Sequence, residues 1–285
     1  MLIKKTSDDA VVGIVVTVLL IGLILVIMVM LNTVYVPKWL ESSEAAHMEE
    51  VSKQFTQLKY ALDIQSTVND STAITTSVTL GNKEIPFFNK GRTFDSLDII
   101  NDAITIDFSP GGSYTSDAII FSSRNSNFVD QSYIYEAGAL IISQDEKSMV
   151  YGNPAIILTD YIEGHTVPPK NVGANITFYI VEINGLAGKT NMMGYGNYPI
   201  YTQATGTSSD TLFQNITSIT ITTNYTNAWK NIFEQAINPN WFANLTYNID
   251  VYPNKITITF LSDQFNFHVR SKNIIAQISS GLAEQ

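Results

Sequence analysis

The sequence predicts an α+β protein, in which an N-terminal transmembrane helix continues into an amphipathic helix and a mainly antiparallel, β-sandwich-like domain with one internal helix follows. Three observations predict this fold class. An apolar run occupies residues 10–31, and an apolar stripe at helical spacing lies within residues 41–68. Beyond residue 69, short β-branched segments alternate with turn residues.

The composition of the 285-residue chain indicates a folded protein and excludes several function classes. Its 14 Tyr, 14 Phe and 3 Trp supply enough apolar mass for a core. The 26 Asp and Glu outnumber the 16 Lys and Arg, so the net charge is -10 and we expect no nucleic-acid partner. With no Cys and only three His, we also expect neither a metal site nor a cofactor.

The apolar run AVVGIVVTVLLIGLILVIMVML, from Ala10 to Leu31, predicts a membrane-spanning helix. At about 1.5 Å per residue it would extend roughly 33 Å, which matches a hydrocarbon core of about 30 Å. The alternative, a helix buried in a globular core, is rarely apolar on every face. A cleaved secretory signal would have a shorter apolar region.

The order of the segments predicts a single-pass protein of the cell membrane. Lys4 and Lys5 precede the span and several Glu residues follow it, which favours a cytoplasmic N-terminus and an exterior C-terminal domain. The predicted divisions are a cytoplasmic or cleaved leader over 1–9, a transmembrane helix over 10–36, an amphipathic stalk helix over 38–68 and an exterior β-rich domain over 69–285.

Five Asn-x-Ser/Thr sequons agree with an exterior domain. A chain rich in Asn, Ser and Thr also generates such sequons by chance. The resulting glycosylation candidates are Asn69, Asn175, Asn215, Asn224 and Asn244.

The stalk segment predicts a second helix. Pro37 is expected to kink or break the chain between the two helices, because proline lacks an N–H and restricts the residue before it. The segment carries one apolar stripe at helical spacing. Such a stripe is typical of a helix packed on its own domain, and it also suits a helix that packs against neighbouring copies. The stripe consists of Met48, Val51, Phe55, Leu58 and Leu62.

The remaining residues predict one β-rich domain with an internal helix over 225–237. Alternation of Ile and Thr in KITITFL, from Lys255, is typical of an antiparallel sheet with one face in water. The Gly-, Asn- and Thr-rich segment 185–209 predicts an exposed loop region. The predicted strands cover residues 73–80, 103–108, 118–121, 133–143, 154–158, 175–183, 216–223, 245–252, 255–261 and 265–270.

No common catalytic motif is present, and we expect no enzyme. The carboxylates Asp95, Asp98, Asp102 and Asp107 could gather three oxygen ligands for calcium if their segment began as a helical turn, but a solvated acidic face is the expected arrangement. Residues 107–113 predict a turn between two strands.

Two histidines and three tyrosines are further candidates. His165 lies in a predicted surface loop, and no nucleophile can be assigned to it. His268 alternates with Phe267 and Val269 and should therefore face water or a polar neighbour. An adhesive or sugar-binding surface could use exposed aromatic rings, although tyrosines packed on the sheet would give the same pattern. The ligand-surface candidates are Tyr195, Tyr198 and Tyr201.

The N-terminus has two Lys, then the polar segment 6–9, and then the apolar run, which leads into an amphipathic helix. It resembles the N-terminus of archaeal type IV pilin-like proteins. The stretches YIYEAGALIISQ and ITTNYTNAWKNIFEQ resemble parts of large surface proteins of that kind. The resemblance implies cleavage before the apolar helix, which then anchors the subunit and packs with other such helices. In that family a small residue precedes the bond that is cut. Here Ser7 could serve, Asp8 would not, and no Gly is available.

The sequence thus predicts a membrane-anchored, pilin-like surface or filament subunit with a structural or adhesive role. Its expected partners are the lipid bilayer and other copies or pilin-like subunits through residues 10–65. Gly13 and Gly22 would lie on opposite helix faces, which would allow two separate contacts. The alternatives are a non-polymerising tethered protein that binds a glycan or envelope component and, third, an ectoenzyme.

Overall fold

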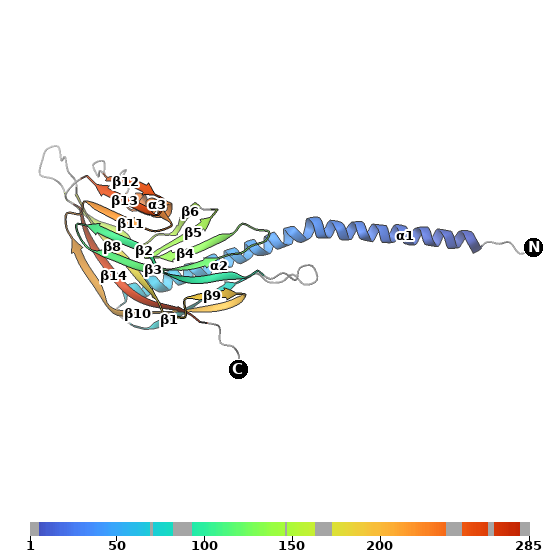
Figure 1. Ribbon diagram of the computed structural model, residues 1–285, viewed down its shortest axis with the longest axis horizontal. Coiled ribbons are helices and arrows are strands. Elements are labelled where there is room, and N and C mark those ends of the chain that lie inside the picture. Colours follow the sequence, from blue (N-terminus) through green and yellow to red (C-terminus); the bar gives the residue numbers. More distant parts are fainter. Residues whose placement is uncertain are drawn as a thin grey trace, which may run out of the picture.

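The computed structural model describes residues 6–68, 71–81, 93–145, 147–162, 173–237, 247–261 and 265–279. It confirms the α+β class: a long N-terminal helix precedes two curled, mainly antiparallel sheets with one short internal helix. The first half of the long helix projects away from the sheets, whereas its second half runs along them (Figure 1).

The long helix is continuous, so a break at Pro37, one of the two expected outcomes, is wrong. A π-helical turn joins its two α-helical parts, and the N–H of Val36 donates to the carbonyl of Leu31. Pro37 has no N–H and its ring crowds the preceding turn, so a wider turn placed just before it accommodates the ring without ending the helix. The parts are α1 (Thr6–Met30), η1 (Leu31–Tyr35) and α2 (Val36–Thr67).

Helix α2 packs on its own domain, as one of the two interpretations of its stripe predicted. Met48 is 2% exposed and the other four stripe residues are fully buried. The Phe55 ring lies 6.4 Å from that of Phe121 and 5.9 Å from that of Tyr133, measured between centroids. Packing against neighbouring copies stays a prediction.

The first sheet has five strands, and one of them corrects the sequence prediction. Of the loop region predicted over 185–209, only residues 186–190 form a turn, because most of the rest belongs to β10, which pairs along both edges, with β1 and with β14. Its Thr, Ser and Gly resemble loop residues, yet the two neighbours satisfy its backbone groups. Strands β14 and β8 are parallel and the other pairs antiparallel. In order, the strands are β1 (Ala73–Leu80), β10 (Gly196–Phe213), β14 (Phe265–Ile278), β8 (Gly173–Gly185) and β7 (Ile156–Ile162).

The second sheet is antiparallel, and β9 (Asn191–Gly194) pairs with its strand β2. The single strand predicted over 133–143 is wrong: Ala137 and Gly138, with φ of 47° and 93°, form a two-residue hairpin turn there. In order, its strands are β12 (Tyr247–Tyr252), β13 (Lys255–Phe260), β11 (Ser218–Thr222), β2 (Asp95–Ser109), β3 (Ser113–Ser122), β4 (Gln131–Glu136), β5 (Ala139–Gln144) and β6 (Lys147–Gly152).

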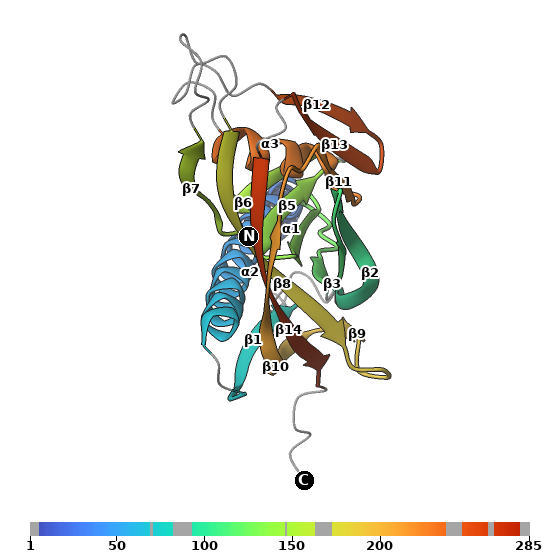
Figure 2. The ribbon, with the colours of Figure 1, turned by 90° about the vertical axis from the view of Figure 1, so that its left-hand side faces the viewer.

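Two hydrophobic cores form, one around each of the helices that pack on the sheets. Helix α3 (Thr226–Ala236) lies near β11, β12 and β13, apart from α2 (Figure 2). Strand β14 serves both cores: Phe267 and Val269 pack in the core of α3, whereas Ile274 and Ala276 pack in the core of α2. The buried face of β14 therefore changes near its middle, between Val269 and Ile274.

Candidate functional site

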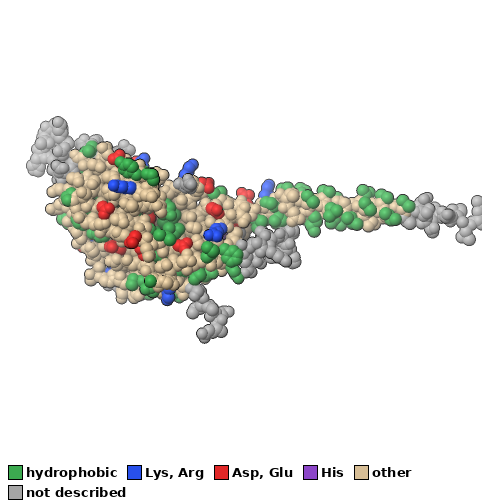
Figure 3. Space-filling model, viewed as in Figure 1, with side chains coloured by type: hydrophobic (Ala, Val, Ile, Leu, Met, Phe, Trp, Pro, Cys, Tyr) green, Lys and Arg blue, Asp and Glu red, His purple; other side chains and the backbone are tan. Residues whose placement is uncertain are grey.

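The projecting part of the long helix is the largest exposed apolar surface of the described chain. Every large hydrophobic side chain from Val11 to Met30 is 49–68% exposed (Figure 3). The helix is long and apolar enough to cross a membrane, two properties that signal sequences share. Its polar Thr17 donates a hydrogen bond to the carbonyl of Gly13 at 2.8 Å. The hydroxyl group therefore has its hydrogen-bond partner within the helix.

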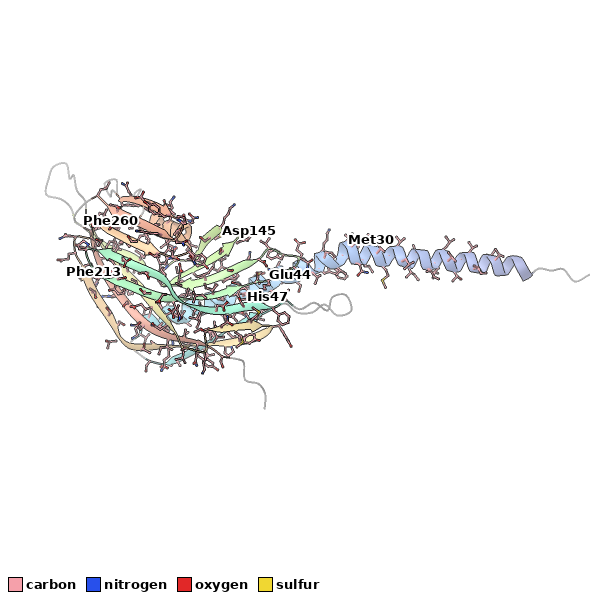
Figure 4. All side chains as sticks on the ribbon, viewed as in Figure 1. Met30, Glu44, His47, Asp145, Phe213 and Phe260 are labelled. Carbon is pink, nitrogen blue, oxygen red and sulfur yellow. The ribbon has the colours of Figure 1, made fainter. Side chains whose placement is uncertain are left out.

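The junction between helix and domain holds two buried carboxylates. Glu44 was not singled out from the sequence, and Asp95 corrects the expectation of a solvated acidic face, because it is fully buried. Glu44, 2% exposed, accepts hydrogen bonds from three consecutive backbone N–H groups, at 3.2, 2.7 and 2.6 Å. These belong to Ser126, Asn127 and Phe128. Figure 4 shows Glu44 and His47 where α2 enters the domain. A carboxylate that accepts several N–H bonds holds its element in one orientation.

The second buried carboxylate belongs to Asp95, which is fully buried at the start of β2. It accepts from the N–H of Gly81 at 2.8 Å and of Arg124 at 3.0 Å, and its Oδ2 lies 2.9 Å from Nε2 of His47. Asp95 thus joins α2, the end of β1 and the loop after β3. Together with Glu44, it fixes the direction in which the helix leaves the domain.

The acidic series does not form a cation site. The helical turn that could have gathered its carboxylates is absent, because Asp95, Asp98, Asp102 and Asp107 all lie in strand β2. Asp98 accepts from Asn191, and Asp102 sits in a register shift with φ of 49°. Within the described ranges, no group of three His, Cys, Asp or Glu could hold a metal ion. The turn predicted over 107–113 is confirmed, since Phe108 N–H donates to Gly112 at 2.9 Å.

The three candidate tyrosines lie near the start of β10, and the structure brings two of them together. The hydroxyl of Tyr198 donates to the carbonyl of Tyr195 at 3.3 Å, and the Tyr195 ring lies 5.9 Å from that of Phe94. Tyr195 is exposed, whereas Tyr198 packs against the core of α2. Tyr201 has the opposite strand parity and faces away from Tyr198. Their ligand role stays a prediction.

The glycosylation candidates differ in their surroundings. Asn215 and Asn224 are exposed, whereas the half-buried Asn175 accepts from the side-chain amide of Asn266 at 2.9 Å. Asn69 and Asn244 lie outside the described residues. Their glycosylation stays a prediction.

Of the two histidine candidates, His165 also lies outside the described residues. His268 contacts the carboxylate of Asp210 and is partly exposed. This placement confirms that His268 faces a polar neighbour.

A pocket of about 420 Å³ opens on the first sheet, just beyond the end of α2. It lies between Ser66 and Thr67 at the helix end and strands β8, β10 and β14. Two basic side chains of β14, Arg270 and Lys272, line it together with Asp210 of β10. This pocket is not among the sites predicted from the sequence. The sequence feature that could have indicated it is the alternation of His268, Arg270 and Lys272. This alternation places three basic side chains on one face of a strand.

A third buried carboxylate, Glu136 at the end of β4, makes stability depend on pH. It accepts from the Trp229 indole at 2.6 Å and the Thr223 hydroxyl at 2.9 Å, but burial dominates and raises its pKa from 4.5 to about 7. A folded-state pKa above the unfolded value means that the folded protein binds this proton more tightly. Glu136 therefore contributes stability below pH 4.5 that is lost as the pH rises through about 7.

We expect Glu136→Gln to flatten this dependence. The native chain should lose about 3 kcal/mol of unfolding free energy between pH 4.5 and 8 relative to the variant, because the Gln side chain does not ionise. Urea unfolding of the full chain across that pH range measures the difference. Glu41→Gln, at an exposed carboxyl group on α2, is the control and should leave the slope unchanged. Parallel pH profiles for the native chain and Glu136→Gln would contradict the prediction.

No protein-family model matches the chain, and neither a curated protein nor a solved structure shows significant similarity to it.

Proposed function

We propose that this protein is a membrane-anchored surface subunit, pilin-like in design, with a structural or adhesive role. One observation carries the proposal: a single helix is exposed and apolar over Val11–Met30 and buries one face against the β-rich domain along α2. A helix with this division suits a bilayer, or the helical core of an assembly, at one end and a folded domain at the other. The domain would face the cell exterior.

The N-terminus of the protein from its native membranes tests the anchor. We expect cleavage between Lys5 and Ala10, which would leave the apolar helix on the mature chain, and retention in membranes after carbonate extraction. Edman sequencing and intact mass give the cut site. An intact N-terminus would indicate a permanent tether instead of a processed subunit. Cleavage beyond Leu31 would mean a released protein and would contradict the proposal.

Two glycines test assembly without disturbing the subunit. A Cβ added at Gly13 or Gly22 meets no atom within 4 Å, so Gly22→Leu should leave the fold and membrane retention unchanged. If neighbouring helices approach at this point, the added side chain should deplete the high-mass assembly in sheared surface material. Leu25→Ile, a conservative change on the same helix, is the control. Full assembly of both Gly13→Leu and Gly22→Leu would contradict close packing at the glycines.

The alternative is a tethered protein that does not polymerise and binds a glycan or envelope component. The exposed Tyr195 beside Phe94 suits such contact. Recovery of the protein only as a detergent-extracted monomer would favour this alternative.

A further inference from the structure

The pocket beyond the end of α2 exists because β10 bulges away from β14. Their pairing runs through Thr205 with Asn273 and resumes at Ser209 with Ser271. Three residues of β10, 206–208, therefore stand opposite the single residue Lys272. Gly206, at φ of 67°, directs its carbonyl to Nζ of Lys272 at 2.8 Å. The bulge forms one wall, and the end of α2 forms another.

Lys272 is 2% exposed and lines this pocket. An ammonium group carries three donors, and the carbonyl of Gly206 is its one hydrogen-bond acceptor among the described residues. In the same part of the chain, no carboxylate forms an ion pair with it. Burying a lysine without a counter-charge is unfavourable and rare. The protein alone therefore leaves this ammonium group without a counter-charge and with only one hydrogen-bond acceptor among the described residues.

The neighbouring charges do not neutralise Lys272. The carboxylate of Asp210 is engaged by Nε of Arg270 at 3.3 Å and by His268. Arg270 also donates to the hydroxyl of Tyr179 at 3.0 Å, and its guanidinium carbon lies 5.6 Å from the centroid of that ring. Two full positive charges thus line the pocket against one negative charge, in a chain whose net charge is -10.

The rest of the lining is rich in hydroxyl groups and has few large apolar side chains. The volume of the pocket, about 420 Å³, is in the range of small-molecule sites. Hydroxyl groups both donate and accept, which suits a ligand that itself carries several hydroxyls. The hydroxyl residues of the lining are Ser66, Thr67, Thr207, Ser208, Ser209 and Ser271.

We propose that this pocket binds an acidic saccharide unit, whose anionic group is held by Lys272 and Arg270 and whose hydroxyls contact the Ser and Thr side chains. The anionic group can be the carboxylate of a uronic acid or the phosphate of a sugar phosphate, since both meet the same donors. The inference goes beyond the proposed anchoring role and does not depend on it, because binding can be measured on isolated monomers.

Calorimetric titration of the full chain in detergent micelles tests the proposal with four probes. D-glucuronate and glucose 6-phosphate carry an anion and hydroxyls, D-glucose carries hydroxyls alone, and acetate carries an anion alone. We expect glucuronate or glucose 6-phosphate to bind about tenfold or more tightly than the other two, and the better one identifies the anion. Failure of both to bind, or equal binding of acetate, would overturn the proposal.

Lys272→Met separates a ligand-binding lysine from a structural one. We expect affinity to fall about tenfold or more while the melting temperature stays level or rises, because a buried charge without a carboxylate is removed. Lys255→Met, at an exposed lysine of β13, is the control and should change neither. The exposed Arg270→Gln supplies a second variant that should fold and bind weakly. Native affinity in both Lys272→Met and Arg270→Gln would overturn the proposal.

Discussion

Asp95→Ala should lower the free energy of unfolding by about 3–5 kcal/mol. The fully buried carboxylate accepts two backbone N–H groups and contacts His47, so its removal leaves three polar groups without their partner. Urea unfolding of the full chain in detergent micelles, followed by tryptophan fluorescence, gives the value. The three groups come from α2, the residue that follows β1 and the loop after β3, so the loss should destabilise the whole domain.

A control for this change lies on the same sheet. Asp250, on the edge strand β12, is exposed, and Asp250→Ala should change stability by less than about 0.5 kcal/mol. A loss below about 1 kcal/mol in Asp95→Ala would mean that water replaces the carboxylate, and that Asp95 does not fix the helix.

Phe55→Ala, the second large effect, should also cost about 3–5 kcal/mol. The ring is fully buried in the core of α2 and packs between Phe121 and Tyr133, so truncation removes apolar contact and leaves a cavity. The same unfolding measurement applies. We expect an unchanged slope with denaturant concentration, since the surface exposed on unfolding stays nearly the same.

Tyr60→Ala is the matched control for Phe55→Ala, because it removes an aromatic ring from the same helix. Its side chain is 69% exposed, and we expect a change within about 0.5 kcal/mol. Similar losses in both variants would show that α2 is stabilised as a helix and not by its packing against the sheets.

The parts of the fold that the sequence predicted are those encoded by local periodicity. The apolar run, the stripe from Met48 to Leu62 and the strand over 73–80 each depend on residues close together in the chain. Strand β10 was missed because its side chains are those of a loop, and only pairing with β1 and β14 makes it a strand. The parallel pairing of β14 with β8 likewise has no local signal.

The candidate site follows the same division. The exposed apolar helix was visible in the sequence because its chemistry lies in one continuous segment. Glu44 and Asp95 were not, because their donors come from segments distant in the chain, including 126–128. The role of Lys272 depends on a bulge in β10 more than sixty residues earlier. Its alternation with Arg270 could be read, but the pocket around it could not.

The continuity of the helix through η1 has a geometric consequence. Because no flexible linker separates the apolar segment from α2, the number of residues between them sets the azimuth of the domain around the helix axis. One residue added within Leu31–Tyr35 would turn the domain by about 100° and move it by about 1.5 Å. The side that the domain presents around the axis of the apolar helix is thus encoded in the length of that helix.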